Sequence, residues 1–200
     1  MHSSAQDRLE IQAFPRALSA YAPELLSMLN ENRLGAPRYS FQVYLDGETL
    51  VIPSRVYYPA ESLLALAVNC QPSQTMALCL GTRHADGHVR EACLQRLLTR
   101  GENWIAPYVI QLVGEYVIEI IQRIDQALPL LDQSMYARYL TQNPGHFATT
   151  ARRVRSYWYC YYRDRYPVFE DYPATRVLQA FGNMRDGIHW AQREGSCGGR

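Results

Sequence analysis

Turn-forming residues divide the chain from residue 73 onward into segments of helical length. The breaks fall at Gly81, Ala85-Asp86-Gly87, Gly101, Asn103, Pro129, Asn143-Pro144-Gly145, Pro167, Pro173 and Gly182. The segments between them run to about 10–20 residues, a usual length for helices that pack in pairs. Residues 6–31 and 59–70 are also predicted to be helical, the first segment broken at Pro15. The short apolar run at 73–82 is predicted to be another helix. The sequence therefore predicts a mainly α fold of stacked antiparallel helix pairs.

One segment, residues 39–58, has the pattern of a β-hairpin instead. Apolar and polar residues alternate over 41–45, and apolar residues return at Leu50 and Ile52. Asp46-Gly47 between them is a favoured two-residue turn, because a type I′ turn needs positive φ at both positions. Pro53 limits the second arm to a short or edge strand. A lone hairpin is marginally stable, so we expect this one to pack against helices.

Length and composition favour one globular domain. The chain has 200 residues, of which 48% are hydrophobic and 20% charged, values typical of a folded protein with a substantial core. We expect a single helical domain over residues 1–195. The last residues, 196–200, are expected to form a disordered tail.

The charge pattern excludes several classes of function. The net charge is only +1, so the whole chain is not strongly attracted to nucleic acid or to an anionic membrane. Every basic residue is arginine and none is lysine. Schiff-base chemistry and a phosphate-binding loop with its lysine are therefore excluded. The arginines are planar groups suited to bidentate contacts and stacking.

Cysteine usage and the N-terminus predict a cytoplasmic protein. The five cysteines are scattered, odd in number and without a C-x-x-C pair, which favours free thiols in a reducing compartment. Residues 1–14 contain no apolar run that resembles a secretion signal. No stretch approaches the roughly 20 apolar residues that span a bilayer, so no membrane association is expected.

The segment from Arg83 to Pro107 combines several helix-boundary signals. Asp86 is predicted to cap the helix that follows it, and Gly101 to end that helix in a left-handed conformation. Asn103 is predicted to cap the next helix, with Pro107 in its first turn.

This segment resembles the HEAT-like α-helical repeat proteins over about residues 76–128. The resemblance rests on Asp86, Val89, Arg90, Glu91, Ala92, Leu97-Leu98, Ile105-Ala106-Pro107 and the stretch IQLVGEYVIEII at 110–121. In such proteins the aspartate caps the second helix of a pair, and the arginine bonds along the stack, so the resemblance implies these roles for Asp86 and Arg90. It implies an interaction scaffold in most cases and a DNA-repair glycosylase in a few.

The turn at residues 83–91 is the first candidate site. Arg83, His84, Asp86, His88 and Arg90 lie close together in sequence there. They can form a capped turn between helices that has a structural or an interaction role. The alternative is a metal or acid–base site, but Asp86 and Gly87 prevent His84 and His88 from sharing one helical face.

No recognisable catalytic motif accompanies this turn. The H-E-x-x-H, G-x-S-x-G, Walker and G-x-G-x-x-G patterns do not occur. Cys79 and Cys93 are better explained as buried structural thiols than as a reactive pair. We expect no catalytic residue, no metal and no cofactor, and the enzymatic alternative would need a carboxylic acid of raised pKa in a pocket.

Residues 152–167 are the second candidate site, because this segment contains five arginines and six aromatic residues. In a helix, Val154, Trp158 and Tyr161 fall on one stripe, which is expected to be core. The residues on a second stripe, expected to face outward, are Arg152, Arg155, Tyr159 and Arg163. Three explanations remain open for this stripe. It is a solvated face whose arginines pair with Glu170, Asp171 and nearby acids, a surface for another protein, or a surface on which nucleic-acid bases stack.

Together these features predict a non-enzymatic cytoplasmic scaffold or accessory protein that binds another protein, for example an immunity or regulatory protein. The alternative is a nucleic-acid-binding protein that uses the arginine–tyrosine stripe. The identity of the partner does not follow from the sequence.

Overall fold

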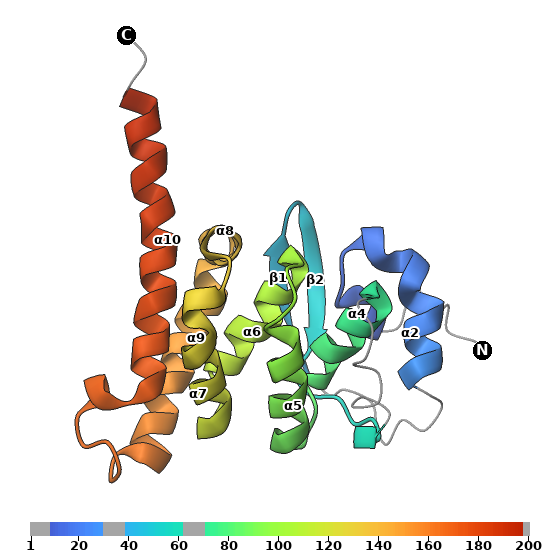
Figure 1. The fold of residues 1–200 in the computed structure, drawn as a ribbon, viewed down its shortest axis with the longest axis horizontal. Coiled ribbons are helices and arrows are strands. Elements are labelled where there is room, and N and C mark those ends of the chain that lie inside the picture. The colour runs from blue at the N-terminus through green and yellow to red at the C-terminus, as the bar shows by residue number, and fades with distance from the viewer. Residues whose placement is uncertain (1–8, 30–38, 62–70, 198–200) are drawn as a thin grey trace. The chain divides into compact units, whose positions relative to one another are not determined.

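The computed structural model describes residues 9–29, 39–61 and 71–197 (Figure 1). The chain forms two compact units, Met1–Tyr108 and Val109–Arg200. The division falls inside helix α6 (Ala106–Val113). Each unit is described separately below, and the expectation of a single domain over 1–195 stays a prediction.

In the first unit a β-hairpin packs with short helices. Its elements are α1 (Leu9–Gln12), the 3₁₀ helix η2 (Arg16–Tyr21), α2 (Ala22–Leu29), β1 (Ser40–Leu45), β2 (Glu48–Pro53), α4 (Pro72–Gly81), α5 (Gly87–Leu97) and the 3₁₀ helix η3 (Asn103–Ile105). α1 packs on β2, α2 on α4, and α4 on α5. Of the helix predicted at 59–70, the described residues include only the first turn at Ala60-Glu61, and the rest lies outside them.

The hairpin confirms the prediction made from Asp46-Gly47. β1 and β2 are antiparallel, and Leu45 pairs with Glu48 across the turn. Asp46 has φ 48° and Gly47 has φ 98°, the positive values that a type I′ turn requires. Pro53 ends β2, as expected for a residue that cannot donate to a strand ladder.

The core of the first unit explains why its sequence alternates in one place and is almost uniformly apolar in another. One face of the hairpin is buried through Val43, Leu45, Leu50 and Ile52. α4 is buried nearly all round, since its neighbours lie on several sides. Such a helix shows little amphipathic periodicity, and the sequence of α4 accordingly shows none.

Two boundary predictions in this unit were wrong. Gly101 does not adopt positive φ, because α5 ends in a tightened turn in which Thr99 and Arg100 donate to carbonyls three residues back. Asn103 does not cap a helix through its side chain. Its amide nitrogen instead donates to the Asp46 carboxylate, at 2.8 Å, and so ties η3 to the hairpin turn.

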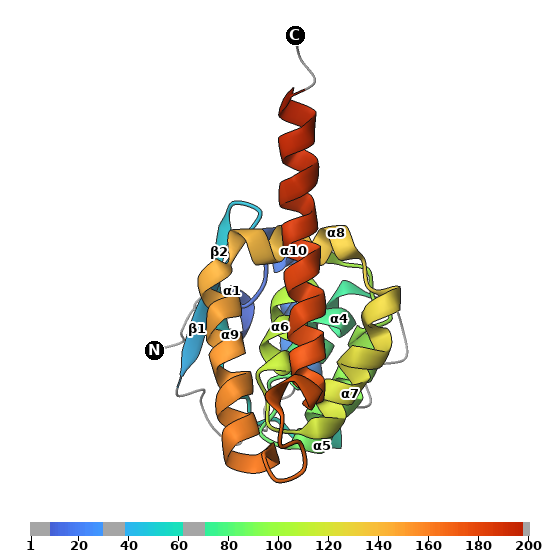
Figure 2. The same ribbon diagram turned by 90° about the vertical axis from the view of Figure 1, so that its left-hand side faces the viewer.

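The described secondary-structure elements of the second unit are all helices. Its elements are α7 (Ile118–Ala127), η4 (Leu128–Leu130), α8 (Gln133–Gln142), α9 (Pro144–Tyr157), the π turn η5 (Trp158–Tyr162), η6 (Phe169–Asp171) and α10 (Pro173–Cys197). α10 lies between α9 and the α7–α8 pair (Figure 2). Arg176 on α10 pairs with Asp125 on α7. α10 runs from Pro173 to Cys197 without interruption, so the helix break predicted at Gly182 was wrong. The disorder predicted for a tail from residue 196 is not tested.

Within the described residues the chain has nine α-helices and one two-stranded hairpin, which confirms the mainly α prediction. None of the helices in that part of the chain is long and apolar enough to cross a membrane.

Candidate binding surface

The arginine-rich segment forms the end of α9 and the π turn that follows it. α9 ends at Tyr157, and Trp158–Tyr162 continue as a π turn, in which hydrogen bonds span five residues instead of four. The Trp158 ring packs edge-on against Phe169, with 5.1 Å between centroids, and its Nε1 donates to the Tyr166 carbonyl at 2.8 Å. These contacts hold the π turn against the loop that leads to α10.

The prediction that Tyr161 lies in the core was wrong, because of the π turn. Tyr161, expected in the core, has 65% of its surface exposed. A π turn takes one residue more than an α turn, so the inward position after Trp158 passes to Tyr162. The Tyr162 ring stacks on buried Tyr172, with 5.1 Å between centroids, and its hydroxyl donates to the Tyr116 carbonyl at 2.5 Å. Burial and the Glu119 carboxylate raise the pKa of Tyr162, which keeps this hydroxyl protonated.

The four residues predicted to face outward are all exposed. We call Arg152, Arg155, Tyr159 and Arg163 the arginine–tyrosine surface. The Arg155 guanidinium lies 4.4 Å from the centre of the Phe169 ring, and that of Arg163 lies 4.8 Å from the centre of the Tyr159 ring. Arg152 donates to the Thr149 hydroxyl at 2.8 Å. Stacking on rings restrains two of the guanidinium groups without neutralising their charge.

The arginines of this surface have no acidic partner in the part of the chain that the structure describes. Glu170 and Asp171, which the solvated-face explanation assigned to them, form no ion pair with Arg152, Arg155 or Arg163. The predicted pairing is therefore absent among the described residues, while the choice between a solvated face and a binding surface stays open. The surface combines unneutralised guanidinium groups with a tyrosine, Tyr159, that is 63% exposed.

Three side chains of the second unit are linked by hydrogen bonds that hold the start of α9 in place. The Tyr139 hydroxyl donates to His146 Nδ1, and His146 Nε2 donates to the side-chain oxygen of Gln111, both at 2.7 Å. Gln111 Oε1 can only accept, which assigns the Nε2–H form to neutral His146. No sequence pattern indicated these bonds, since Gln111 lies 35 residues from His146. They fix the helix that carries the arginine–tyrosine surface.

The turn at residues 83–91 is mainly internal. Arg83 and Arg90 are fully buried. Arg90 donates from Nη1 to the carbonyls of His84 and Ala85, at 2.9 and 2.8 Å, and Arg83 donates from Nη2 to the Ser54 carbonyl at 2.9 Å. Asp86 caps α5 as predicted, because its carboxylate accepts from the His88 amide at 2.8 Å.

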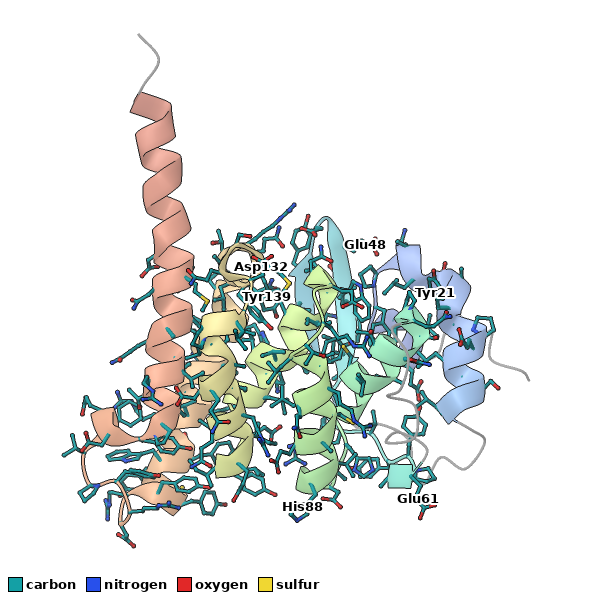
Figure 3. The ribbon with its side chains drawn as sticks, viewed as in Figure 1. Tyr21, Glu48, Glu61, His88, Asp132 and Tyr139 are labelled. Carbon is teal, nitrogen blue, oxygen red and sulfur yellow. The ribbon has the colours of Figure 1, made fainter. Side chains whose placement is uncertain are left out.

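Of these five residues, only Asp86 and His88 are exposed, and His88 projects from the start of α5 (Figure 3). Both nitrogens of His84 are used within the turn. Nδ1 accepts from the Asp86 amide at 3.0 Å, and Nε2 donates to the Tyr58 carbonyl at 2.8 Å. Because a metal ligand needs a free lone pair on nitrogen, this arrangement disfavours metal binding by His84. The described residues contain no cluster of three or more potential metal ligands.

Cys79 and Cys93 lie in the interior of the first unit as free thiols. Burial, with a smaller contribution from the Glu102 carboxylate, raises the pKa of Cys79 well above its usual value. Burial also raises the pKa of Cys93 to about 12. Both thiols therefore stay protonated near neutral pH, which makes them poor nucleophiles.

No sequence pattern indicated a pocket in the first unit. A pocket of about 590 Å³ lies among α1, η2, β2 and α4. Phe14, Leu18, Val51 and Met76 contribute apolar surface, and Arg16 and Glu48 contribute opposite charges. We call it the N-terminal pocket. Glu48, labelled in Figure 3, accepts a hydrogen bond from the backbone N–H of Arg16 at 2.9 Å.

No protein family, curated protein or solved structure shows significant similarity to this chain. The geometry of the chain itself is therefore the basis for a functional proposal.

Proposed function

We propose that this chain is a non-enzymatic cytoplasmic accessory protein that binds an acidic surface of another protein through the arginine–tyrosine surface. The observation that carries the proposal is the absence of ion pairs to Arg152, Arg155 and Arg163 among the described residues. Three exposed arginines lie along the end of α9 and the π turn that follows it, with exposed Tyr159 between Arg155 and Arg163 in sequence. Arginine and tyrosine are enriched among the residues that dominate protein-binding energies.

Ring stacking favours binding by this surface. Arg155 rests on Phe169 and Arg163 on Tyr159, so each guanidinium loses less side-chain freedom on docking. Each group can still donate bidentate hydrogen bonds to a carboxylate. The cationic face therefore complements glutamate and aspartate side chains on a folded partner.

Nearby acids favour a protein partner over nucleic acid. Asp164, Glu170 and Asp171 are exposed close to the arginines in sequence. A continuous phosphate backbone would be repelled by these carboxylates, whereas a protein surface of mixed charge accommodates them. The low net charge of the chain points the same way.

Single-stranded nucleic acid is the second candidate ligand. The observation that favours it is the exposure of Tyr159 and Tyr161 beside unpaired arginines, since bases stack on such rings with little sequence preference. This candidate requires binding that weakens steeply with salt.

The HEAT-like arrangement of residues 76–128 also belongs to the proposal. It is supported by α4 and α5, consecutive helices that pack together and are joined by the turn capped by Asp86. The two hydrogen bonds from Arg90 Nη1 stay within that turn. A scaffold of such pairs would present the arginine–tyrosine surface without contributing chemistry of its own.

The experiment is affinity purification from the source cells with and without nuclease, followed by calorimetric titration of any stoichiometric partner. The test variant carries Arg152→Gln, Arg155→Gln and Arg163→Gln. The control variant carries Arg96→Gln, Arg123→Gln and Arg138→Gln, which removes the same charge from other exposed positions.

The proposal predicts a nuclease-resistant protein partner whose affinity falls at least roughly 100-fold in the test variant, as expected for loss of several dominant side chains. The control variant should bind within about threefold of the parent. Equal losses in both variants would contradict the assigned surface. Release of the partner by nuclease, with binding of a labelled oligonucleotide that the test variant loses, would establish the second candidate instead.

A further inference from the structure

The N-terminal pocket has the size and lining of a small-molecule site, and the proposed protein-binding function does not involve it. Its volume of about 590 Å³ lies within the range of pockets that hold drug-sized ligands. The arginine–tyrosine surface belongs to the second unit, whereas the pocket lies entirely within the first.

The apolar part of the pocket comes from elements distant in sequence. Phe14 and Met76 are buried, while Leu18 and Val51 are half-buried beside them. Val51 faces the pocket from β2, and the neighbouring Leu50 and Ile52 point to the core on the opposite face of the strand. This apolar lining can accept aliphatic or aromatic groups.

Two opposite charges line the same pocket without neutralising each other. The Glu48 carboxylate accepts the backbone N–H of Arg16. Among the residues that the structure describes, however, neither the Arg16 guanidinium nor the Glu48 carboxylate forms an ion pair. A ligand carrying only an anion would meet repulsion from Glu48, and one carrying only a cation would meet repulsion from Arg16.

We propose that the N-terminal pocket binds a zwitterionic dipeptide with large apolar side chains. Its carboxylate meets the Arg16 guanidinium, its ammonium meets Glu48, and its side chains lie against the apolar lining. A guanidinium matches a carboxylate in bidentate geometry, and a carboxylate is the usual partner of an ammonium. A single amino acid would leave most of the 590 Å³ empty, whereas two apolar residues occupy more of it.

The test is isothermal titration calorimetry of the full chain with leucyl-phenylalanine, its C-terminal amide and its N-acetyl form. The free dipeptide should bind at one site with a Kd on the order of 0.1 mM, as expected for a ligand of this size. Each capped form should bind roughly tenfold more weakly, because it lacks one charge-assisted contact.

Charge substitutions assign each end of the ligand to its residue. Arg16→Gln should remove the preference for the free carboxylate, and Glu48→Gln should remove the preference for the free amine. Glutamine keeps a carbonyl oxygen that can still accept the Arg16 backbone N–H, so neither variant is expected to disturb folding. Arg152→Gln and Glu170→Gln are the matched controls and should leave both preferences unchanged.

A third variant, Val51→Trp, fills the apolar lining and should abolish binding while the circular dichroism spectrum stays unchanged. The proposal is overturned by absence of binding up to about 10 mM, by equal binding of the capped and free forms, or by preferences that survive Arg16→Gln and Glu48→Gln. If Val51→Trp fails to fold, the two charge variants decide the question by themselves.

Discussion

Replacing Gly81 with alanine tests the packing of α4 against α5. A Cβ added at Gly81 would lie 2.3 Å from Cys93 Sγ and 3.1 Å from Cys93 Cβ. The first distance is shorter than real contacts of a Cβ atom, so something must shift. Cys93 is fully buried, so that shift takes place within the core. Residue 81 is the last residue of α4. Without the steric overlap, the higher helix propensity of alanine would stabilise the folded protein by up to about 1 kcal/mol.

The two effects oppose each other, and the steric one is larger. Overpacking of a core typically costs about 1–3 kcal/mol, and this contact belongs at the upper end of that range. Subtracting the gain in helix propensity leaves a net destabilisation of about 2 kcal/mol, which lowers Tm by roughly 4–8 °C in a chain of this size. Differential scanning calorimetry measures both quantities.

A double-mutant cycle identifies the cause. Cys93→Ala alone should destabilise by about 1 kcal/mol, because it removes a buried sulfur. Combined with Gly81→Ala, it removes the 2.3 Å overlap, so the double variant should be more stable than the sum of the single changes predicts by about 1 kcal/mol or more. Additive energies would refute the reasoning.

The matched control for the glycine substitution is Gly182→Ala in α10. An added Cβ there meets no atom within 4 Å, so the same chemical change should raise the stability by up to about 1 kcal/mol. The two glycines lie in different compact units. If those units unfold in separate transitions, Gly81→Ala changes the midpoint of one transition and Gly182→Ala changes the midpoint of the other. A Gly81→Ala variant as stable as the parent would also contradict the predicted overlap.

Three further outcomes follow from single side chains. Asp132→Ala should destabilise α8 by about 1 kcal/mol in urea unfolding, because its carboxylate caps that helix. Hydrogen bonds, chiefly from the Ser134 side chain, hold the pKa of Asp132 below its usual value. The stabilisation by the charged Asp132 is therefore fully present above the pKa of Asp132 in the unfolded state. It is lost as the pH falls through the lower pKa of Asp132 in the folded state. Urea unfolding at pH 7 and at pH 3 measures this loss. Tyr172→Phe should be neutral or stabilising by up to about 1 kcal/mol in the same assay, since the buried hydroxyl has no hydrogen-bond partner among the described residues; a loss above about 1 kcal/mol would reveal a partner. Maleimide at pH 8, followed by peptide mass mapping, should label exposed Cys160 quickly and buried Cys93 slowly, and equal rates would contradict the burial of Cys93.

Local chemistry explains which parts of the fold were predictable from the sequence. Asp46-Gly47 specifies its turn through backbone preferences of the two residues themselves, so the hairpin was predicted correctly. Asp86 likewise caps α5 through an amide two residues away. Both features depend on neighbours in sequence, and propensity rules describe such neighbours well.

The features that the sequence did not predict depend on distant partners. Asn103 bonds to Asp46, 57 residues away, instead of capping its own helix. The N-terminal pocket needs Phe14, Val51 and Met76 together, and no periodicity relates their positions. The candidate surface was predicted in part, because helical spacing places Arg152, Arg155, Tyr159 and Arg163 together. Whether those arginines pair with Glu170 and Asp171 depends on the course of a loop, which spacing alone does not give.

The π turn at Trp158–Tyr162 has a consequence for how this protein can diverge. A π turn holds one residue more than the α turn it replaces. Deletion of a single codon within residues 158–162 would restore regular α geometry and rotate every later side chain of the segment by about 100° around the helix axis. A homologue that differs by this one deletion would present different tyrosines and arginines to solvent while keeping Val154 and the preceding helix unchanged. The binding surface can therefore change its specificity through one insertion or deletion, without any substitution in the core.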